Sequence, residues 1–284
     1  MKKIIIITWF AAMSSQYVSA QAEHEVSVNA GGGLSALLYK PSQGTSNAGG
    51  GGEFGVGYTF FSDKLQAAET GTVIRAQWGI HTGLRLGLYG AKAQVNNEKA
   101  ETKNLTDDEG DDFILYTLLT GYKETQRAMS LNIPVMALYL IEPYYVMAGV
   151  KINIPLTGKY KSKDATLTNE AYYIDYENWL KTQTFAGYGE FRGKKSDGSV
   201  DLGVTVMLSL EGGYKWRLNS QFVLYTGAYF DYGLNNTFKG TQTQFVNYDR
   251  NNPSGFTTNS VMSSFAQKVH LIAFGLTARL AMNL

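Results

Sequence analysis

The strongest constraint on this chain is a two-residue alternation of apolar with small or polar residues, which recurs in many segments. Near the C-terminus the alternate positions are all apolar: Ile272, Phe274, Leu276, Ala278, Leu280, Met282 and Leu284. Successive side chains of a β-strand point to opposite faces, so this period predicts a strand with one apolar face. The same alternation spans 201–216, 222–232, 144–154 and 78–89, with weaker copies at 26–38, 54–60 and 131–139. The sequence therefore predicts an all-β fold.

The residues between the apolar positions indicate what the apolar face touches. They are rich in glycine, as at Gly79, Gly83 and Gly87, and the chain holds 31 glycines. In a soluble sandwich this second face would meet water and carry long charged side chains. In a small membrane barrel it lines a narrow lumen, where side chains must be small or paired. We therefore expect a closed antiparallel transmembrane β-barrel of about eight strands.

Short and long connections alternate between the expected strands. Short turns are expected around 62–64, 141–143 and 217–220, with Asn219 as the turn former of the third. Long connections are expected at about 41–50, 97–111, 160–199 and 239–263. The stretch 113–140 is interpreted as one long strand that projects beyond the membrane, although 122–127 could hold an additional hairpin. The pattern predicts short periplasmic turns and long extracellular loops.

Aromatic side chains give a second indication of a membrane barrel. Membrane barrels carry aromatic girdles where their outward face crosses the bilayer interfaces. By parity eight aromatic residues point outward, most of them beside the short turns: Tyr58, Phe60, Trp78, Tyr139, Tyr144, Tyr214, Trp216 and Phe222. We expect them to form a girdle at the periplasmic rim.

The N-terminus has the features of a secretory signal peptide. Lys2 and Lys3 precede an apolar stretch, and Val18-Ser19-Ala20 supplies small residues for cleavage. We expect a signal peptide over 1–20 and one outer-membrane barrel domain over 21–284. No cysteine is present, so a lipoprotein anchor and disulfides are excluded. After the signal peptide no apolar run approaches the roughly 20 residues of a membrane-spanning helix.

Seven charged residues are expected to face the lumen from different strands. They carry both signs: Glu53, Arg85, Lys151, Glu211, Lys215, Asp231 and Arg279. Charges in a low-dielectric interior must pair, which favours a salt-bridge plug over a gated ion path. If they form a plug, replacing Arg85 or Arg279 by alanine should mainly lower the unfolding temperature.

The sequence shows no catalytic, cofactor or metal motif. Barrel enzymes need a histidine beside carboxylate or serine partners, and only His24, His81 and His270 are present. His81 is expected in the lumen network and His270 near the lipid headgroups. The glycines at 49–57 precede a strand and not a helix, so nucleotide binding is rejected. The acidic stretch 98–112 could bind a divalent cation, but its spacing matches no EF-hand.

Four aromatic residues in the longest connection are candidates for recognition: Tyr172, Tyr173, Tyr176 and Trp179. Exposed aromatic side chains are common anchors of recognition surfaces. The alternative is that these four side chains pack over the barrel mouth.

The mature chain resembles outer-membrane barrels of the OmpA transmembrane type and PorT-like barrels. The resemblance rests on Val28-Asn29-Ala30-Gly31-Gly32, on the strand from Trp78 to Leu84, and on Tyr122-Lys123-Glu124 followed by Leu131-Asn132-Ile133-Pro134. The final alternating strand adds to it. A terminal apolar residue, Leu284, resembles the signal read by the barrel-assembly machinery, which the resemblance implies as a partner. No peptidoglycan-binding domain is expected after Leu284.

We therefore expect a non-enzymatic outer-membrane protein of a Gram-negative bacterium, with a structural or surface-interaction role through its extracellular loops. Alternatives are a narrow channel or an accessory of a secretion machine, and more weakly a barrel enzyme acting on lipid or peptide. Expected partners are outer-membrane lipid, lipopolysaccharide and a surface or host partner. Nucleic acid is not expected, because 25 basic residues nearly balance 24 acidic ones.

Overall fold

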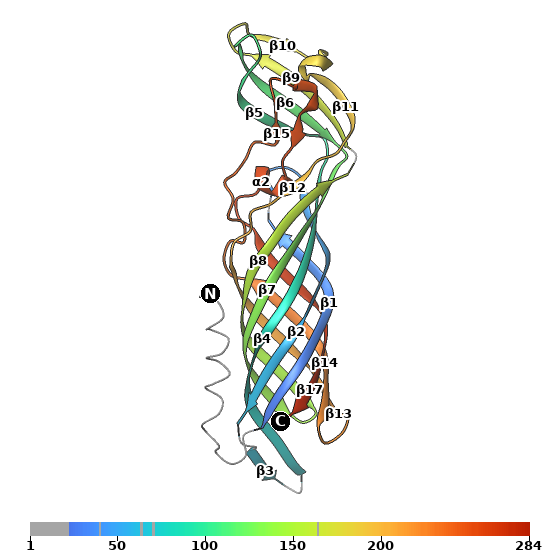
Figure 1. Ribbon diagram of the computed structural model, residues 1–284, viewed down its shortest axis with the longest axis vertical. Helices are drawn as coiled ribbons and strands as arrows, with labels where there is room; N and C mark the ends of the chain where they lie inside the picture. Colours follow the sequence, from blue (N-terminus) through green and yellow to red (C-terminus); the bar gives the residue numbers. More distant parts are fainter. Residues whose placement is uncertain (1–22, 40, 63–64, 70–71, 164) are drawn as a thin grey trace, which may run out of the picture.

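The computed structural model describes residues 23–39, 41–62, 65–69, 72–163 and 165–284. The signal peptide expected over 1–20 lies outside these residues, so the division into a leader and one barrel domain stays a prediction. The described chain is elongated, with a ring of long strands below a smaller sheet (Figure 1). Among the described residues no helix is both long and apolar enough to cross a membrane.

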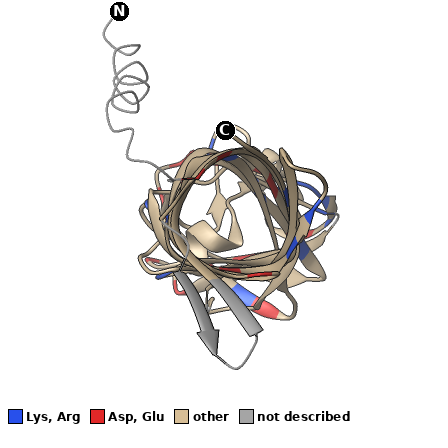
Figure 2. Ribbon diagram, turned by 90° about the horizontal axis from the view of Figure 1, so that it is seen from below, with Lys and Arg blue, Asp and Glu red and all other residues tan. Residues whose placement is uncertain are grey.

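Eight antiparallel strands form the ring. Their bounds are β1 (His24–Leu38), β2 (Thr45–Phe61), β4 (Thr72–Val95), β7 (Tyr122–Ile141), β8 (Tyr144–Ser162), β13 (Thr205–Arg217), β14 (Phe222–Gly233) and β17 (His270–Asn283). The pairing runs β1-β2-β4-β7-β8-β13-β14-β17 and returns from β17 to β1. Seen end-on, the strands enclose an interior in which a short helix stands (Figure 2). The all-β antiparallel class and the eight ring strands are confirmed.

The two faces of the ring differ as the alternation predicts. Apolar side chains on the outside are exposed, with Trp78 at 51% and Leu88 at 59% of their surface. We call this outward set the apolar belt, and on β4 it comprises Trp78, Ile80, Leu84, Leu86 and Leu88. The inward face is buried and often lacks side chains because neighbouring backbones approach closely. A Cβ on Gly33 would lie 2.1 Å from the carbonyl oxygen of Phe274.

The two ends of the ring are different. One end, called the turn end, carries the Glu142–Pro143 turn between β7 and β8 and the turn between β13 and β14. There the Asn219 side-chain oxygen accepts hydrogen bonds from the backbone N–H groups of Gln221 and Phe222, at 2.8 and 2.7 Å. The connection after β2 is longer than the expected turn at 62–64. It contains a further strand, β3 (Leu65–Glu69), which pairs with the start of β4.

At the opposite end the long connections form a second sheet, which we call the extension. It contains β5 (Glu98–Thr106), β6 (Asp112–Thr120), β9 (Ala165–Tyr173), β10 (Asn178–Leu180) and β11 (Gly189–Lys194). Strands β5, β6, β9 and β10 lie in the order β10-β9-β6-β5, and β11 also pairs with β9. The extension stands above the ring in Figure 1. The expected loops at 97–111 and 160–199 are therefore wrong, because both stretches contain strands of this sheet.

Two further expectations about strands and loops are corrected. The stretch 113–140 is not one strand, because Gly121 has a φ of 67° and separates β6 from β7. Glycine adopts this left-handed conformation without steric cost, so the chain turns there into a different sheet. The expected connection at 41–50 is also too long, since β2 begins at Thr45.

The last connection folds back into the mouth of the ring. It contains β15 (Val246–Asn247), η3 (Pro253–Gly255), β16 (Thr257–Thr258) and α2 (Val261–Phe265). Earlier, η2 (Thr184–Ala186) precedes β11, and β12 (Asp197–Ser199) pairs with β8. Val261, Met262 and Phe265 of α2 are buried in one apolar cluster with inward residues of the ring such as Leu37 and Tyr89. Helix α2 therefore plugs the ring from the extension end.

Candidate functional site

The interior of the ring holds a connected network of buried charges. The Lys151 ammonium lies between two carboxylates, 3.1 Å from Glu53 and 2.7 Å from Asp231. Arg85 pairs with the other oxygen of Glu53 at 2.5 Å. The Ser209 hydroxyl donates a hydrogen bond to Asp231 at 2.6 Å. The side chains of all four charged residues are at most 5% exposed, so each charge depends on the others for compensation.

The remaining predicted lumen charges lie nearer the turn end. Arg279 is 3.9 Å from Glu211 and sits over the Tyr225 ring, 4.3 Å from its centroid. Lys215 is 3.7 Å from Glu25, which accepts a hydrogen bond of 2.8 Å from the Tyr225 hydroxyl. Glu25 was not among the predicted residues. Glu25, Ser27 and Asn29 occupy alternate positions of β1, opposite the apolar face of that strand. This alternation could have predicted that Glu25 points into the lumen.

Layers of apolar side chains pack on both sides of the group formed by Glu53, Lys151 and Asp231. At the turn end the layer contains Phe61, Met136, Leu138, Leu140, Tyr145, Met147, Val223, Tyr225 and Ala281. At the extension end α2 and its neighbours form the second layer. Between them the hollow beside Glu53, Tyr89 and Asp231 is too small to admit a water molecule.

We expect no stable conductance from the folded protein in planar bilayers, because buried ion pairs and apolar side chains occupy the described interior of the ring. The measurement is single-channel recording across a range of voltages, with a porin as the positive control. Reproducible ion-selective steps would contradict the filled lumen.

The three histidines do not form a catalytic group. His81 lies in the lumen, with its ring nitrogens 2.9 Å from the Thr59 hydroxyl and 3.1 Å from Arg85. His24 contacts the Tyr58 hydroxyl at the turn end, and His270 contacts the carbonyl oxygen of Gly233. Within the described ranges none of these rings contacts a carboxylate, so they provide no histidine–acid pair.

A buried carboxylate fastens the plug to the ring. Glu124, on the inward face of β7, accepts hydrogen bonds from the Ser260 hydroxyl at 2.5 Å and from the backbone N–H of Val261 at 2.9 Å. Gln126 donates a further hydrogen bond at 2.8 Å. Burial raises the pKa of Glu124 above its ordinary value of 4.5. Residues 260 and 261 begin α2, so Glu124 holds the start of the plug helix.

The outer face of the extension carries an aromatic cluster. Trp179 on β10 has its ring centroid 5.1 Å from that of Tyr172 on β9 and 5.2 Å from that of Tyr116 on β6. We call these three residues the aromatic face. They meet because residues two apart on a strand share one face and because β6, β9 and β10 are neighbours in register. Trp179 is 42% exposed, and the Lys181 ammonium lies over its ring, 5.5 Å from the centroid.

Charged residues around the aromatic face largely neutralise one another. Glu170 is 3.4 Å from Lys99 and 3.4 Å from Lys181. Glu101 is 3.2 Å from Lys103 and accepts a hydrogen bond of 3.1 Å from the Tyr116 hydroxyl. This surface therefore combines aromatic rings with polar groups and has little net charge.

The other two predicted recognition residues lie elsewhere. Tyr173 points into the extension and is buried, with its hydroxyl 2.9 Å from that of Tyr188 and 2.9 Å from Asp107. Burial raises the pKa of Tyr173 to about 12. Tyr176 is exposed and donates a hydrogen bond to Asp111 at 3.1 Å. Of the four predicted residues, Tyr172 and Trp179 lie on the aromatic face, Tyr173 is buried in the extension, and Tyr176 is exposed at a different place.

The acidic stretch 98–112 does not form a metal site in the described part of the chain. No cluster of three or more histidine, cysteine, aspartate or glutamate residues is arranged to hold an ion there. Burial alone would raise the pKa of Asp107, but hydrogen bonds from the backbone N–H of Asp111 and the Tyr173 hydroxyl lower it. Asp107 therefore stabilises its own loop through these hydrogen bonds.

The eight predicted girdle residues face outward near the turn end. Several rings pack together, with centroid distances of 4.3 Å between Trp78 and Tyr139 and 4.5 Å between Tyr214 and Trp216. Tyr144 adds a further contact of 5.5 Å to Tyr214. Each pair of aromatic rings belongs either to two neighbouring strands or to successive outward positions of one strand. This is the arrangement expected of a girdle around the outside of the barrel.

Comparisons with known proteins give a structural likeness and no match in sequence. No protein-family model matches the chain, and no curated protein matches its sequence. Among solved structures the chain is similar to the outer membrane protease OmpT from Escherichia coli, with 11% sequence identity and a TM-score of 0.32. The alignment covers 95% of this chain and 99% of that one. At this level of similarity neither the functional residues nor the activity of that protein can be assigned to this chain.

The expectation of a non-enzymatic structural or surface-interaction protein is nevertheless corrected. The solved structure to which the chain is similar is that of an enzyme, which contradicts this expectation, and we do not retain it. The likeness does not bear on the OmpA-type and PorT-like resemblances, which stay predictions. What the chain binds must therefore be argued from its own residues.

Proposed function

We propose that the chain crosses the outer membrane as a closed β-barrel and that the extension recognises a carbohydrate ligand or substrate outside the cell. The membrane part of the proposal rests on the ring itself. Its outward face exposes apolar side chains such as Ile80, Leu84 and Leu86, which would be costly in water. The aromatic girdle at the turn end is typical of a bilayer interface.

The orientation follows from the same features. Short turns in outer-membrane barrels face the periplasm and long connections face the exterior. The turn end would therefore be periplasmic, and the extension would stand outside the cell. The signal peptide and the barrel-assembly machinery remain part of this proposal as the expected route to the membrane. A narrow channel gains no support, because the lumen is filled.

The aromatic face is the observation that carries the proposed recognition. One side of a sugar ring presents polarised C–H groups, which are attracted to the electron-rich face of an aromatic ring. The Trp179 ring lies 5.1 Å from the Tyr172 ring and 5.2 Å from the Tyr116 ring, so three aromatic rings are grouped around Trp179. The carboxylates of Glu101 and Glu170 at the edge can accept hydrogen bonds from sugar hydroxyls.

The charge balance around the aromatic face favours a neutral ligand. Lys99 and Lys181 are already engaged by Glu170, so a strongly charged ligand would find no unpaired opposite charge there. A neutral polyhydroxylated chain requires no such charge. We therefore favour a neutral glycan over a highly charged peptide or a nucleic acid.

Replacing Trp179 by alanine is expected to weaken glycan binding by about 2 kcal/mol, because an exposed aromatic anchor commonly contributes that much. This corresponds to a roughly thirtyfold increase in Kd. The measurement is a glycan array with the full protein in detergent, followed by calorimetric titration of the glycans that bind.

The matched control is Phe185→Ala, since Phe185 is 79% exposed but does not belong to the aromatic face. It should leave the Kd unchanged. Absence of binding by the native protein to every glycan would overturn the proposal. Equal losses in the Trp179 and Phe185 variants would do the same.

A further inference from the structure

The outside of the ring is strongly basic just beyond the apolar belt, on the side of the extension. Six exposed cations lie there, five in the neighbouring strands β4, β7 and β8 and one directly after β8: Lys92, Lys123, Arg127, Lys159, Lys161 and Lys163. We call them the basic band. They alternate with buried inward residues such as Glu124 and Tyr160, so strand parity fixes their outward direction.

The basic band adjoins the apolar belt directly. Arg127 is two residues from Met129, the last exposed apolar residue of β7 on this side. Lys159 is three residues beyond the exposed Leu156 of β8. The same molecule could therefore contact cations with one part and apolar side chains with another. That combination selects an amphiphile with an anionic headgroup.

Several cations of the basic band lie close to one another. Arg127 and Lys159 lie directly opposite each other on β7 and β8, which places like charges side by side. In the described residues none of the six forms an ion pair with a carboxylate. Asp197 lies opposite Lys161 in the register without pairing to it. An external anion between the strands would relieve this repulsion.

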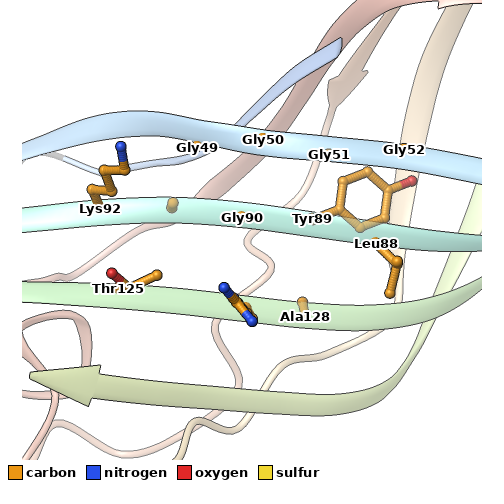
Figure 3. A pocket seen from close by; sticks show the side chains of 12 residues that line it. Gly49, Gly50, Gly51, Gly52, Leu88, Tyr89, Gly90, Lys92, Thr125 and Ala128 are labelled. Atoms are coloured by element: carbon orange, nitrogen blue, oxygen red, sulfur yellow. The ribbon is translucent and has the colours of Figure 1, made fainter. Parts of the chain in front are cut away.

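Two hollows flank Arg127 and provide space for such a headgroup. The first has a volume of about 570 Å³ and is bordered by Lys92 and by glycines 49–52, which present no side chains (Figure 3). The second has about 530 Å³ and is bordered by Lys159, Lys161 and Asp197. Thr125 and Arg127 line both hollows, so a ligand at Arg127 has access to either side.

We propose that the basic band binds the phosphate groups of an acylated glycolipid of the outer leaflet, with its acyl chains lying along the apolar belt. Arginine and lysine form short charge-assisted hydrogen bonds with phosphate oxygens. Acyl chains would cover Leu88, Met129 and Leu156 below. This inference rests on the proposed membrane placement and is independent of glycan recognition by the aromatic face.

The test uses the full mature protein in neutral detergent and measures retained lipid by native mass spectrometry. The probes are diphosphoryl lipid A and the same lipid without its phosphates. We expect retention of the phosphorylated form to be about tenfold greater, as expected for one or more charge-assisted phosphate contacts. Excess inorganic phosphate should not displace it, because free phosphate cannot use the apolar belt. Displacement would instead indicate an anion site without a lipid.

The decisive variant is R127Q/K159Q/K161Q, which should lower retention of the phosphorylated lipid to that of the unphosphorylated form. Its matched control, K239Q/R250Q/K268Q, removes the same number of exposed cations from the last long connection and should retain the lipid like the native protein. Heat-dependent gel mobility identifies folded barrels in each case. Failure to insert into liposomes would overturn the membrane placement. Normal insertion with equal retention of both lipids would overturn this inference alone.

Discussion

Replacing Lys151 by methionine is expected to lower the free energy of unfolding by about 3–5 kcal/mol, which is the usual cost of leaving a buried charge without its partner. Lys151 is 1% exposed and is the cation that joins Glu53 to Asp231. Methionine fills similar space but removes the ammonium, so two buried carboxylates would face each other. Arg85 compensates only Glu53. The measurement is urea unfolding in lipid vesicles, followed by gel mobility.

The second variant of this experiment is K151M/D231N, which removes both partners of the shorter ion pair. Ser209 still contacts position 231, and Glu53 keeps Arg85, so no uncompensated carboxylate remains. We expect most of the lost stability to return, because the cost comes from the unpaired charge more than from the lost attraction. K99M, in an exposed pair with Glu170, should change stability by less than about 1 kcal/mol. Equal losses for K99M and K151M would contradict a buried network.

The ring and its interior follow from the sequence because strand parity is a local rule. Once 144–154 and 222–232 are interpreted as strands, Lys151 and Asp231 must point to the side opposite Val150 and Phe230. Their pairing then follows from the cost of burying charge. The eight expected strands therefore correspond to the ring, and the seven predicted charges lie inside it.

The extension could not be predicted in the same way. Strand β9 has no apolar-polar contrast strong enough to mark a face, since Thr166 and Thr168 alternate with Leu167 and Asn169. Its pairing with β6, which places Tyr116 opposite Glu170, joins distant parts of the sequence, and no local pattern reports it. Tyr116 was missed because it lies in the stretch interpreted as a long ring strand.

Two adjacent residues of the predicted recognition set point in opposite directions, because successive side chains of a strand alternate between its two faces. Tyr172 and Tyr173 are neighbours in sequence, but one belongs to the aromatic face and the other to the interior of the extension. Composition shows only that the segment is aromatic. The position of each residue on a known strand is needed to distinguish an aromatic ring at the surface from one packed in the interior.

Replacing Glu124 by alanine should release the plug. The variant removes the acceptor for Ser260, Val261 and Gln126, and each buried donor left without a partner costs about 1–3 kcal/mol. We expect amide hydrogen exchange in 260–266 to accelerate at least tenfold, while exchange in the ring strand β14 stays unchanged. Equal protection of 260–266 in the variant and the native protein would show that α2 is held by apolar packing alone.

The same carboxyl should make the plug sensitive to pH. Burial raises the pKa of Glu124 in the folded state, so the folded protein favours the protonated form. Its contribution to stability is then full below the ordinary pKa of 4.5 and falls as pH rises through the raised value. Glutamine cannot ionise, but its amide nitrogen is a donor and replaces one of the two acceptor oxygens. Glu124→Gln should therefore lower the protection of 260–266 at every pH and remove its pH dependence. Glu98→Gln, at an exposed carboxyl of β5, should retain the native pH dependence. A native profile that is flat with pH, or one that Glu124→Gln leaves unaltered, would assign the loss of protection to another group.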